Sequence, residues 1–203
     1  MSEVQAYIES GIIEMYVLGI ASTEEMLEVE AMAAAHPEVS DAIDAFSASI
    51  EQSLLKNAVE PPATVRPFVM ATIDYMDRLT KGEQPANPPI LTEDSKITDY
   101  EEWLNKPQMV VAEDFNGIHA RIIAATPAAL TAIVWIKEMA PAEVHEDEYE
   151  KFLIVEGTCT ITIAGHDHYL KAGDYLTIPL HCQHHVKVTS SIPCKIILQR
   201  VAA

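Results

Sequence analysis

The spacing of apolar residues divides the chain into a helical first half and a strand-rich second half. In the first half, apolar side chains recur three and four positions apart, which is typical of amphipathic helices. Four helices are predicted, over residues 3–19, 22–36, 37–56 and 63–80. From Val110 the spacing changes to two, which indicates strands. The predicted strands cover residues 119–126, 129–137, 148–156, 158–164, 168–171, 175–179, 184–190 and 194–201. Many short strands at regular spacing predict a sandwich or barrel, so the fold class is α+β.

Helix ends are marked by side-chain chemistry. Ser22 precedes Glu25 by three positions, a capping-box arrangement that predicts the start of the second helix. That helix is expected to end before Pro37, which suits the first turn of the next helix. Pro61 and Pro62 break the third helix.

A proline-rich stretch separates the halves. Residues 81–106 contain Gly82, Pro85, Pro88 and Pro89, which favour a linker. Its second half carries Tyr100 and Trp103 and is expected to form a short helix or arm that packs onto one domain or onto a second subunit. The predicted domains are a helical domain at 1–82, a linker or arm at 83–106 and a barrel at 107–203.

The formal charge of the 203-residue chain is −18 and is unevenly distributed. Residues 1–100 hold 18 acidic and 5 basic side chains, whereas residues 101–203 hold 13 and 8. Such a surface excludes direct nucleic-acid binding, which requires cations. It either steers a basic protein toward the first half or only keeps the chain soluble.

Composition also bears on the expected location of the protein. No apolar run approaches the length of a membrane span, and the three cysteines form no C-x-x-C pair. We therefore expect a soluble cytoplasmic protein with reduced thiols and no membrane partner.

Candidate metal ligands are concentrated between residues 143 and 185. Glu143 and His145 are two positions apart, so on a strand they share one face. Glu150 and His184 are expected to reach the same pocket from later strands. Carboxylates and imidazoles together suit Zn, Fe, Mn or Ni. We predict a divalent metal ion held by Glu143, His145, Glu150 and His184, with catalytic residues unassigned.

The spacing resembles the two motifs of the cupin family, G-x5-H-x-H-x3,4-E-x6-G and G-x5-P-x-G-x2-H-x3-N. Gly157 fixes the register of the first motif, in which Glu143 stands at a histidine position. In the second, Gly173, Pro179 and His184 match, and His181 stands at the usual glycine. The resemblance implies a double-stranded β-helix, or jelly-roll, barrel with a metal on its inner wall, and homodimers by analogy.

Alternatives to this ligand set remain open at the level of sequence. His181 could serve as a reserve ligand, or His145 and Asp147 could form the first pair. The site could also have lost its metal and retain only hydrogen-bonded polar groups. His166 and His168 are expected in an exposed hairpin outside the site.

The N-terminal segment resembles the helical domain of anti-sigma factors that sequester extracytoplasmic-function sigma factors. The resemblance is carried by Y-I-E-S-G-I-I-E-M-Y-V-L-G-I-A-S-T-E-E and the following alanine run with His-Pro-Glu. Many members carry a zinc-binding H-x3-C-x2-C element, which this chain lacks, and His36 is interpreted as a helix-terminal residue.

Two functional hypotheses follow. In the first, the resemblance implies a regulatory protein whose helices bind a sigma factor and whose barrel senses a metal or small molecule. In the second, the protein is a metal-dependent cupin enzyme of the dioxygenase or isomerase type, and the helices serve dimerisation. We favour the first, because no general acid, nucleophile or substrate-anchoring arginine stands at a recognisable spacing.

Overall fold

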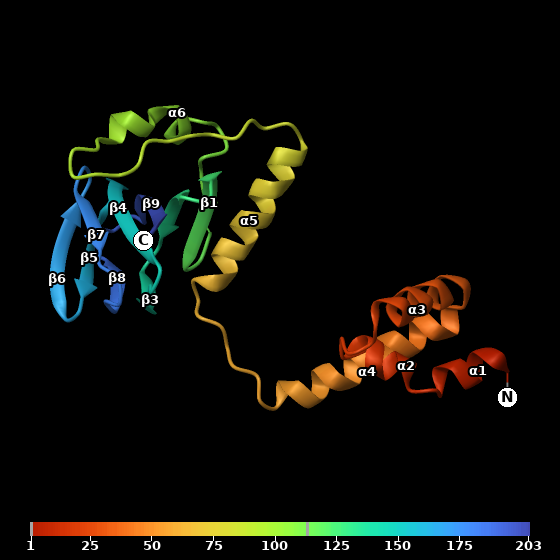
Figure 1. Cartoon of the computed structure of the whole chain (residues 1–203). Helices are drawn as coiled ribbons and strands as arrows, with labels where there is room; N and C mark the ends of the chain where they lie inside the picture. Colours follow the sequence, from red (N-terminus) through yellow and green to blue (C-terminus); the bar gives the residue numbers. More distant parts are fainter. Residues whose placement is uncertain (1, 113) are drawn as a thin grey trace. The chain divides into compact units, whose positions relative to one another are not determined.

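A computed structural model describes residues 2–112 and 114–203 of the chain. The chain forms two compact units, Met1–Glu60 and Pro61–Ala203, which we call the helical unit and the β unit. The sequence prediction drew this boundary at residue 82. It lies earlier because the fourth predicted helix, α5 (Val65–Thr80), packs against strand β1 (Ile118–Ala125) of the β unit. Figure 1 shows this helix beside β1.

The helical unit contains α1 (Glu3–Ile8), α2 (Ile12–Val17), α3 (Thr23–Ala35) and α4 (Pro37–Leu55). The prediction of one helix over residues 3–19 is wrong. Gly11 adopts a left-handed φ of 88° and divides that segment into two helices. The capping box is confirmed: Glu25 N donates to Ser22 Oγ at 3.3 Å, and Ser22 N donates to Glu25 Oε2 at 2.7 Å.

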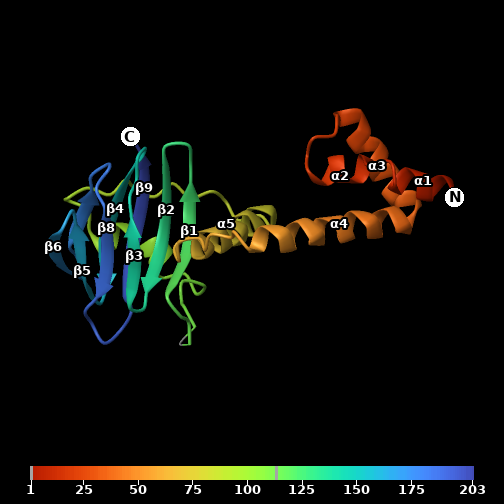
Figure 2. The same cartoon turned by 90° about the horizontal axis from the view of Figure 1, so that it is seen from below.

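Only the first part of α4 is well covered within this unit. The buried apolar residues of the helical unit are Ile13, Ala21, Val29 and Val39. Figure 2 shows α1, α2 and α3 gathered near the N-terminal half of α4. Residues 51–60 are all exposed, including Leu54 and Leu55. No described helix in either unit is long and apolar enough to cross a membrane.

The β unit contains two antiparallel sheets. The first has the strand order β1-β2-β9-β4-β7 and the second β3-β8-β5-β6. The remaining strands are β2 (Ala129–Ile136), β3 (Met139–Glu143), β4 (Glu148–Glu156), β5 (Thr158–Ile163), β6 (His166–Lys171), β7 (Tyr175–Ile178), β8 (His184–Val188) and β9 (Cys194–Ala202). Strand β3 was missing from the predicted strands. Its sequence, M-A-P-A-E, contains a proline and lacks an apolar run, and it lies at a sheet edge.

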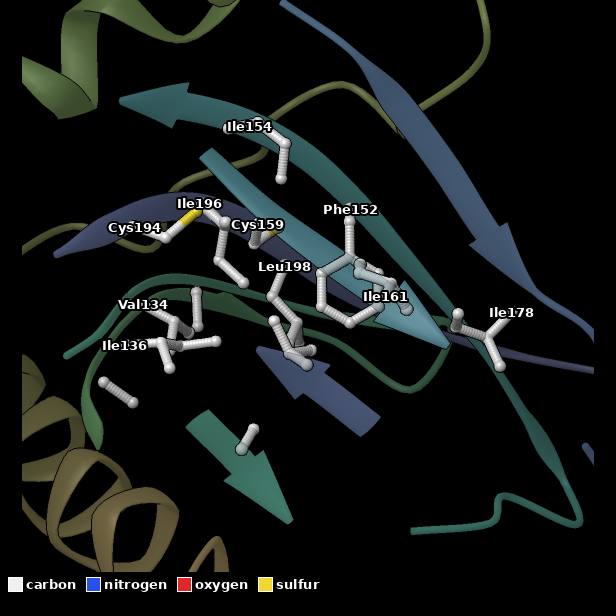
Figure 3. Packing of buried hydrophobic residues seen from close by; sticks show 14 of the residues in the cluster. Val134, Ile136, Phe152, Ile154, Cys159, Ile161, Ile178, Cys194, Ile196 and Leu198 are labelled. Atoms are coloured by element: carbon white, nitrogen blue, oxygen red, sulfur yellow. The ribbon is translucent and has the colours of Figure 1, made fainter. Parts of the chain in front are cut away.

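A core between the two sheets unites residues from both. Phe152, Ile196 and Leu198 from the first sheet pack with Ile161 and Val186 from the second. Figure 3 shows several of these side chains pointing toward one another. Ile154, Ile163, Leu176 and Ile178 contribute to the same core.

A second core lies on the other face of the first sheet, under the predicted linker. Its arm includes the 3-10 helix η1 (Ile97–Tyr100) and helix α6 (Glu101–Leu104), drawn across the β unit in Figure 1. Tyr100 and Trp103 are buried there, as expected for an arm. The side chain of Gln199 on β9 forms hydrogen bonds with the backbone of the arm. Its Oε1 accepts from Leu91 N at 2.7 Å, and its Nε2 donates to Pro89 O at 2.8 Å.

Candidate metal centre

The four predicted ligands converge at one end of the β unit. Glu143 ends β3 and lies opposite His184 of β8 in the antiparallel pairing. Glu150 lies on β4, and His145 lies in the loop between β3 and β4. One donor atom from each residue lies within 4.8 Å of every other. The structure therefore brings together a cluster that could hold a metal ion.

The carboxylate of Glu150 is the centre of this cluster. Its Oε2 lies 2.9 Å from His184 Nε2 and 3.4 Å from His145 Nε2. The Oε1 atom of Glu143 is 4.0 Å from His184 Nε2. The side chain of Glu150 is fully buried, so only its immediate polar neighbours satisfy its charge.

Two observations show that the cluster fits a metal ion. The first is that His145 Nε2 is buried without a hydrogen-bond partner, although it points toward the carboxylate of Glu150. Such an orphaned imidazole nitrogen is suited to a metal ligand. The second is that His184 Nδ1 lies 3.3 Å from the carbonyl oxygen of Cys182. That contact favours a proton on Nδ1, so Nε2 could coordinate a metal ion in place of its hydrogen bond to Glu150 Oε2.

The carboxyl groups of Glu150 and Glu143 differ in pKa. Burial alone would raise the pKa of Glu150, but the imidazoles of His145 and His184 and the charge of Arg200 outweigh it and lower the pKa to about 2. Burial raises the pKa of Glu143, and repulsion by Glu150 adds to this effect. Burial acts to lower the pKa of His184, but its hydrogen bond to Glu150 raises it. One carboxylate is thus held ionised at the centre of the cluster.

Arg200 is a site residue that the sequence analysis left unassigned. Its Nε donates to Glu150 Oε1 at 3.1 Å, and its NH2 nitrogen lies 3.5 Å from Glu143 Oε2. The sequence does contain a pattern that places Arg200 at the site, namely the spacing of two along β9. Arg200 follows Leu198 and Ile196 at every second position, and both face the core between the sheets.

The other candidates lie outside the cluster. His181 is exposed and adopts a left-handed φ of 59°, which explains why the family motif has glycine at this position. Its backbone N–H donates to the carbonyl oxygen of His145 at 2.8 Å. Asp147 is not among the clustered ligands, so the alternative pair is not the arrangement seen. His166 and His168 lie in strand β6 of the hairpin that β5 and β6 form, outside the cluster as predicted, and the turn of this hairpin falls at Ala164 and Gly165.

A cavity of about 400 Å³ adjoins the cluster. Its polar and charged lining residues include Glu143, His145 and Arg200. The first turn of α5 and the residues before it also line it. The lining residues are Pro62, Thr64, Val65, Phe68, Ala142, Glu143, Val144, His145 and Arg200.

Comparison with protein families supports the assignment made from the motif spacing. Residues 131–199 match the family model of the cupin domain. The C-terminal part of the chain is therefore a cupin domain. A search of curated proteins found no match for this chain.

Several solved structures are also similar to this part of the chain. The cupin domain of Cnp3 from Schizosaccharomyces pombe is 11% identical, with a TM-score of 0.42 over 44% of this chain and 67% of that one. KdgF from Halomonas sp. is 22% identical, with a TM-score of 0.40; the match covers 44% of this chain and 84% of KdgF. A cupin-2 domain containing protein from Shewanella frigidimarina is 26% identical, with a TM-score of 0.38; the match covers 43% of this chain and 84% of that protein.

Proposed function

We propose that this protein is a regulator that binds a divalent metal ion in its cupin domain and a sigma factor through its helical unit. The observation that carries the proposal is the convergence of Glu143, His145, Glu150 and His184 within 4.8 Å. We further propose that the two sheets form the double-stranded β-helix of the family. In this view the protein is an anti-sigma factor whose affinity for its partner depends on the cupin site.

The donor set narrows the choice of metal. Two imidazole nitrogens and two carboxylate oxygens suit Fe, Mn, Ni or Zn, whereas Ca and Mg prefer oxygen alone. A bound ion would offer an open coordination position as a Lewis acid. The protein supplies the fixed geometry, since three of the four ligands lie on or end strands of the two sheets.

The charge and the apolar surface of the helical unit favour binding of a basic protein. Residues 1–60 contain 12 acidic side chains and a single basic one, Lys56. An apolar groove of about 510 Å³ runs along the exposed C-terminal half of α4 and includes Val17, Ile50 and Leu54. Acidic surroundings steer a basic partner, and the groove suits an apolar helix face. With the N-terminal resemblance described above, we propose a sigma factor as that partner.

Metal binding is tested by elemental analysis of the full chain purified without a metal-affinity column. We expect one equivalent of a first-row metal per chain, and its loss in the His184→Ala variant. The matched control is His166→Ala, which removes an exposed imidazole in the same domain. A wild-type protein that binds no first-row metal, even when each is supplied, would overturn this part of the proposal.

Partner binding is tested by titrating the full chain with the sigma factors of its own cell. We expect one of them to bind, and Leu54→Glu in the groove to weaken that binding by about 10-fold or more. Leu27→Glu is the control, because Leu27 is equally exposed on α3 but lies outside the groove. Absence of binding to every sigma factor refutes the anti-sigma assignment and leaves the metal site untouched.

The cavity beside the ligands favours one alternative, a metal-dependent cupin enzyme of the dioxygenase or isomerase type. A substrate in that cavity would contact Glu143 and His145 directly. Turnover of a small substrate that stops on chelation and in Glu150→Ala would support this alternative. Binding of a sigma factor without turnover would support the regulator.

A further inference from the structure

The cavity beside the metal ligands is lined by two chemically different groups of residues. Glu143, His145 and Arg200 are polar or charged. Pro62, Val65 and Phe68, at and just before the start of α5, are apolar. A ligand that fits has a polar group at one end and an apolar body at the other.

The charged residues that line the cavity determine which ligand charge the site favours. With a divalent ion bound, the carboxylates of Glu143 and Glu150 balance the two positive charges of the ion, and the imidazoles are neutral. The guanidinium of Arg200 is then left as one uncompensated positive charge. It is only 21% exposed, so water screens this charge weakly. A single negative charge on the ligand would therefore complete the site.

Arg200 is also positioned to bind a planar anion. Its Nε donates to Glu150 Oε1 and its NH2 nitrogen lies 3.5 Å from Glu143 Oε2, so the guanidinium retains the N–H groups of its other terminal nitrogen and one N–H of NH2 for a ligand. The guanidinium lies 4.7 Å from the centre of the Phe68 ring, which holds it as a cation over an aromatic face. Paired N–H donors in this fixed plane match the two oxygens of a carboxylate.

We propose that the cavity binds a small monoanionic carboxylate, with its carboxylate between the metal ion and Arg200 and its apolar part against Val65 and Phe68. This inference rests on the proposed metal binding. It identifies the ligand class that the cupin domain senses and assigns Arg200 as the residue that selects it.

The same cavity provides a route for regulation. Pro62 and Thr64 line it, and they lie two and four residues after Glu60, where one compact unit ends and the other begins. A bound carboxylate would stabilise the turn that leads into α5, in which Val65 N donates to Pro62 O at 2.9 Å. The ligand thus acts on the segment that joins the metal site to the helical unit.

The test uses the full chain loaded with Co²⁺ and benzoate as the probe. The visible spectrum of bound Co²⁺ responds to an added ligand, so we expect benzoate to change it saturably. Benzamide has the same shape without the charge, and we expect at least about 10-fold weaker binding because it cannot pair with the guanidinium. Hydrogen exchange of the peptide covering residues 62–69 is expected to slow with benzoate, while exchange in α3 does not change.

Two variants test the charged and the apolar lining of the cavity. Arg200→Gln is expected to remove the preference for benzoate over benzamide. It is measured at Co²⁺ concentrations at which the spectrum of the bound ion shows that the site is loaded. Phe68→Ala leaves the four metal ligands intact and is expected to weaken benzoate binding by about 5-fold, because apolar contact is lost. Ile73→Ala, on the exposed face of α5, is the control. It is expected to change neither the affinity for benzoate nor the preference for benzoate over benzamide.

The outcomes distinguish this inference from the proposed function. A Co²⁺ spectrum that benzoate does not change, or equal binding of benzamide, overturns the carboxylate site and leaves metal binding in place. A chain that takes up no Co²⁺ or other first-row metal overturns both. Retention of the benzoate preference in Arg200→Gln overturns the role of Arg200.

Discussion

Helix α4 leaves Leu54 63% exposed, whereas strand β9 leaves Ile196 only 1% exposed. This contrast holds throughout the two units. Among the described residues, the helical unit buries four apolar side chains, while the β unit has one core between its sheets and another beneath its arm. Burial of apolar surface is the dominant favourable contribution to folding. We therefore expect the β unit to be the more stable of the two, as the proposed metal site requires, whereas the helical unit leaves apolar surface exposed, where we propose that a partner binds.

The largest expected effect tests the core of the β unit. Ile161 is fully buried between the sheets, and Ile161→Ala should lower the free energy of unfolding by about 4 kcal/mol. Both tryptophans, Trp103 and Trp135, lie in the β unit, so tryptophan fluorescence during urea unfolding reports that unit alone.

The matched change in the helical unit is Val39→Ala. Val39 is also fully buried, and the loss of two methyl groups should cost about 2 kcal/mol in that unit. We expect this cost to appear in the helical circular dichroism signal and not in tryptophan fluorescence. If both variants shift the fluorescence transition equally, the two units unfold together, and the inferred difference in their stability is contradicted.

The second prediction concerns the polar cluster inside the β unit. The pKa of Glu150 falls from its ordinary value to about 2 on folding, so its ionised form stabilises the metal-free protein above about pH 4.5. This stabilisation, on the order of 3 kcal/mol, should be lost as the pH falls toward 2. The Glu150→Gln variant should lack this pH dependence when urea unfolding is followed at pH 5.5 and pH 3 in the presence of chelator.

A comparison of variants is needed because the neighbouring groups shift in the opposite direction. The pKa of Glu143 is raised, so its protonation favours the folded state as the pH falls. The raised pKa of His184 stabilises the folded protein below its ordinary value of 6.5, and that contribution stays constant between pH 5.5 and pH 3. Glu156→Gln, exposed on the same strand as Glu150, is the control. If it alters the pH dependence as much as Glu150→Gln, the effect does not come from the cluster.

The third prediction compares glycines with similar backbone conformations. Gly157 has a φ of 78°, and an added Cβ would lie 2.8 Å from Ser190 Oγ and 2.9 Å from the carbonyl oxygen of Pro193. Gly157→Ala should therefore cost about 3 kcal/mol, because backbone strain and a steric clash add together. Gly11 of the helical unit has a φ of 88° with nothing within 4 Å, so Gly11→Ala should cost only about 1 kcal/mol. Equal costs, measured by thermal unfolding, would contradict closer packing in the β unit.

Sequence predicted those features that depend on local chemistry. The Ser22 capping box, Pro37 at the first helical position and the convergence of Glu143, His145, Glu150 and His184 were all inferred from spacing, and the structure shows each of them. Metal binding by these four residues stays a prediction. Strand β3 and the break at Gly11 were missed. A glycine within an apolar helical pattern does not reveal whether its φ is positive, and an edge strand needs no apolar alternation.

The features that sequence did not predict depend on tertiary contacts. Helix α5 has the same amphipathic pattern as the helices before it, and only its packing against β1 shows which unit it joins. Arg200 could have been placed by counting from Leu198, but its ion pair with Glu150 requires the pairing of β4 with β9. Phe68 contributes to the cavity only because the same packing brings α5 to the ligands.

The smallest predicted effect examines how far the helical unit relies on local signals. Ser22 Oγ accepts from Glu25 N, and Ser22→Ala removes this bond from the start of α3. The expected cost is about 1 kcal/mol, seen as faster hydrogen exchange in the first turn of α3 and a lower midpoint of the helical circular dichroism signal. Ser49→Ala is the control, because Ser49 is exposed in the interior of α4, where alanine favours the helix. In a unit with four buried apolar residues, 1 kcal/mol is a large share of the stability, so Ser22→Ala should also weaken partner binding. An unchanged helical transition would show that packing, and not capping, determines the stability of this unit.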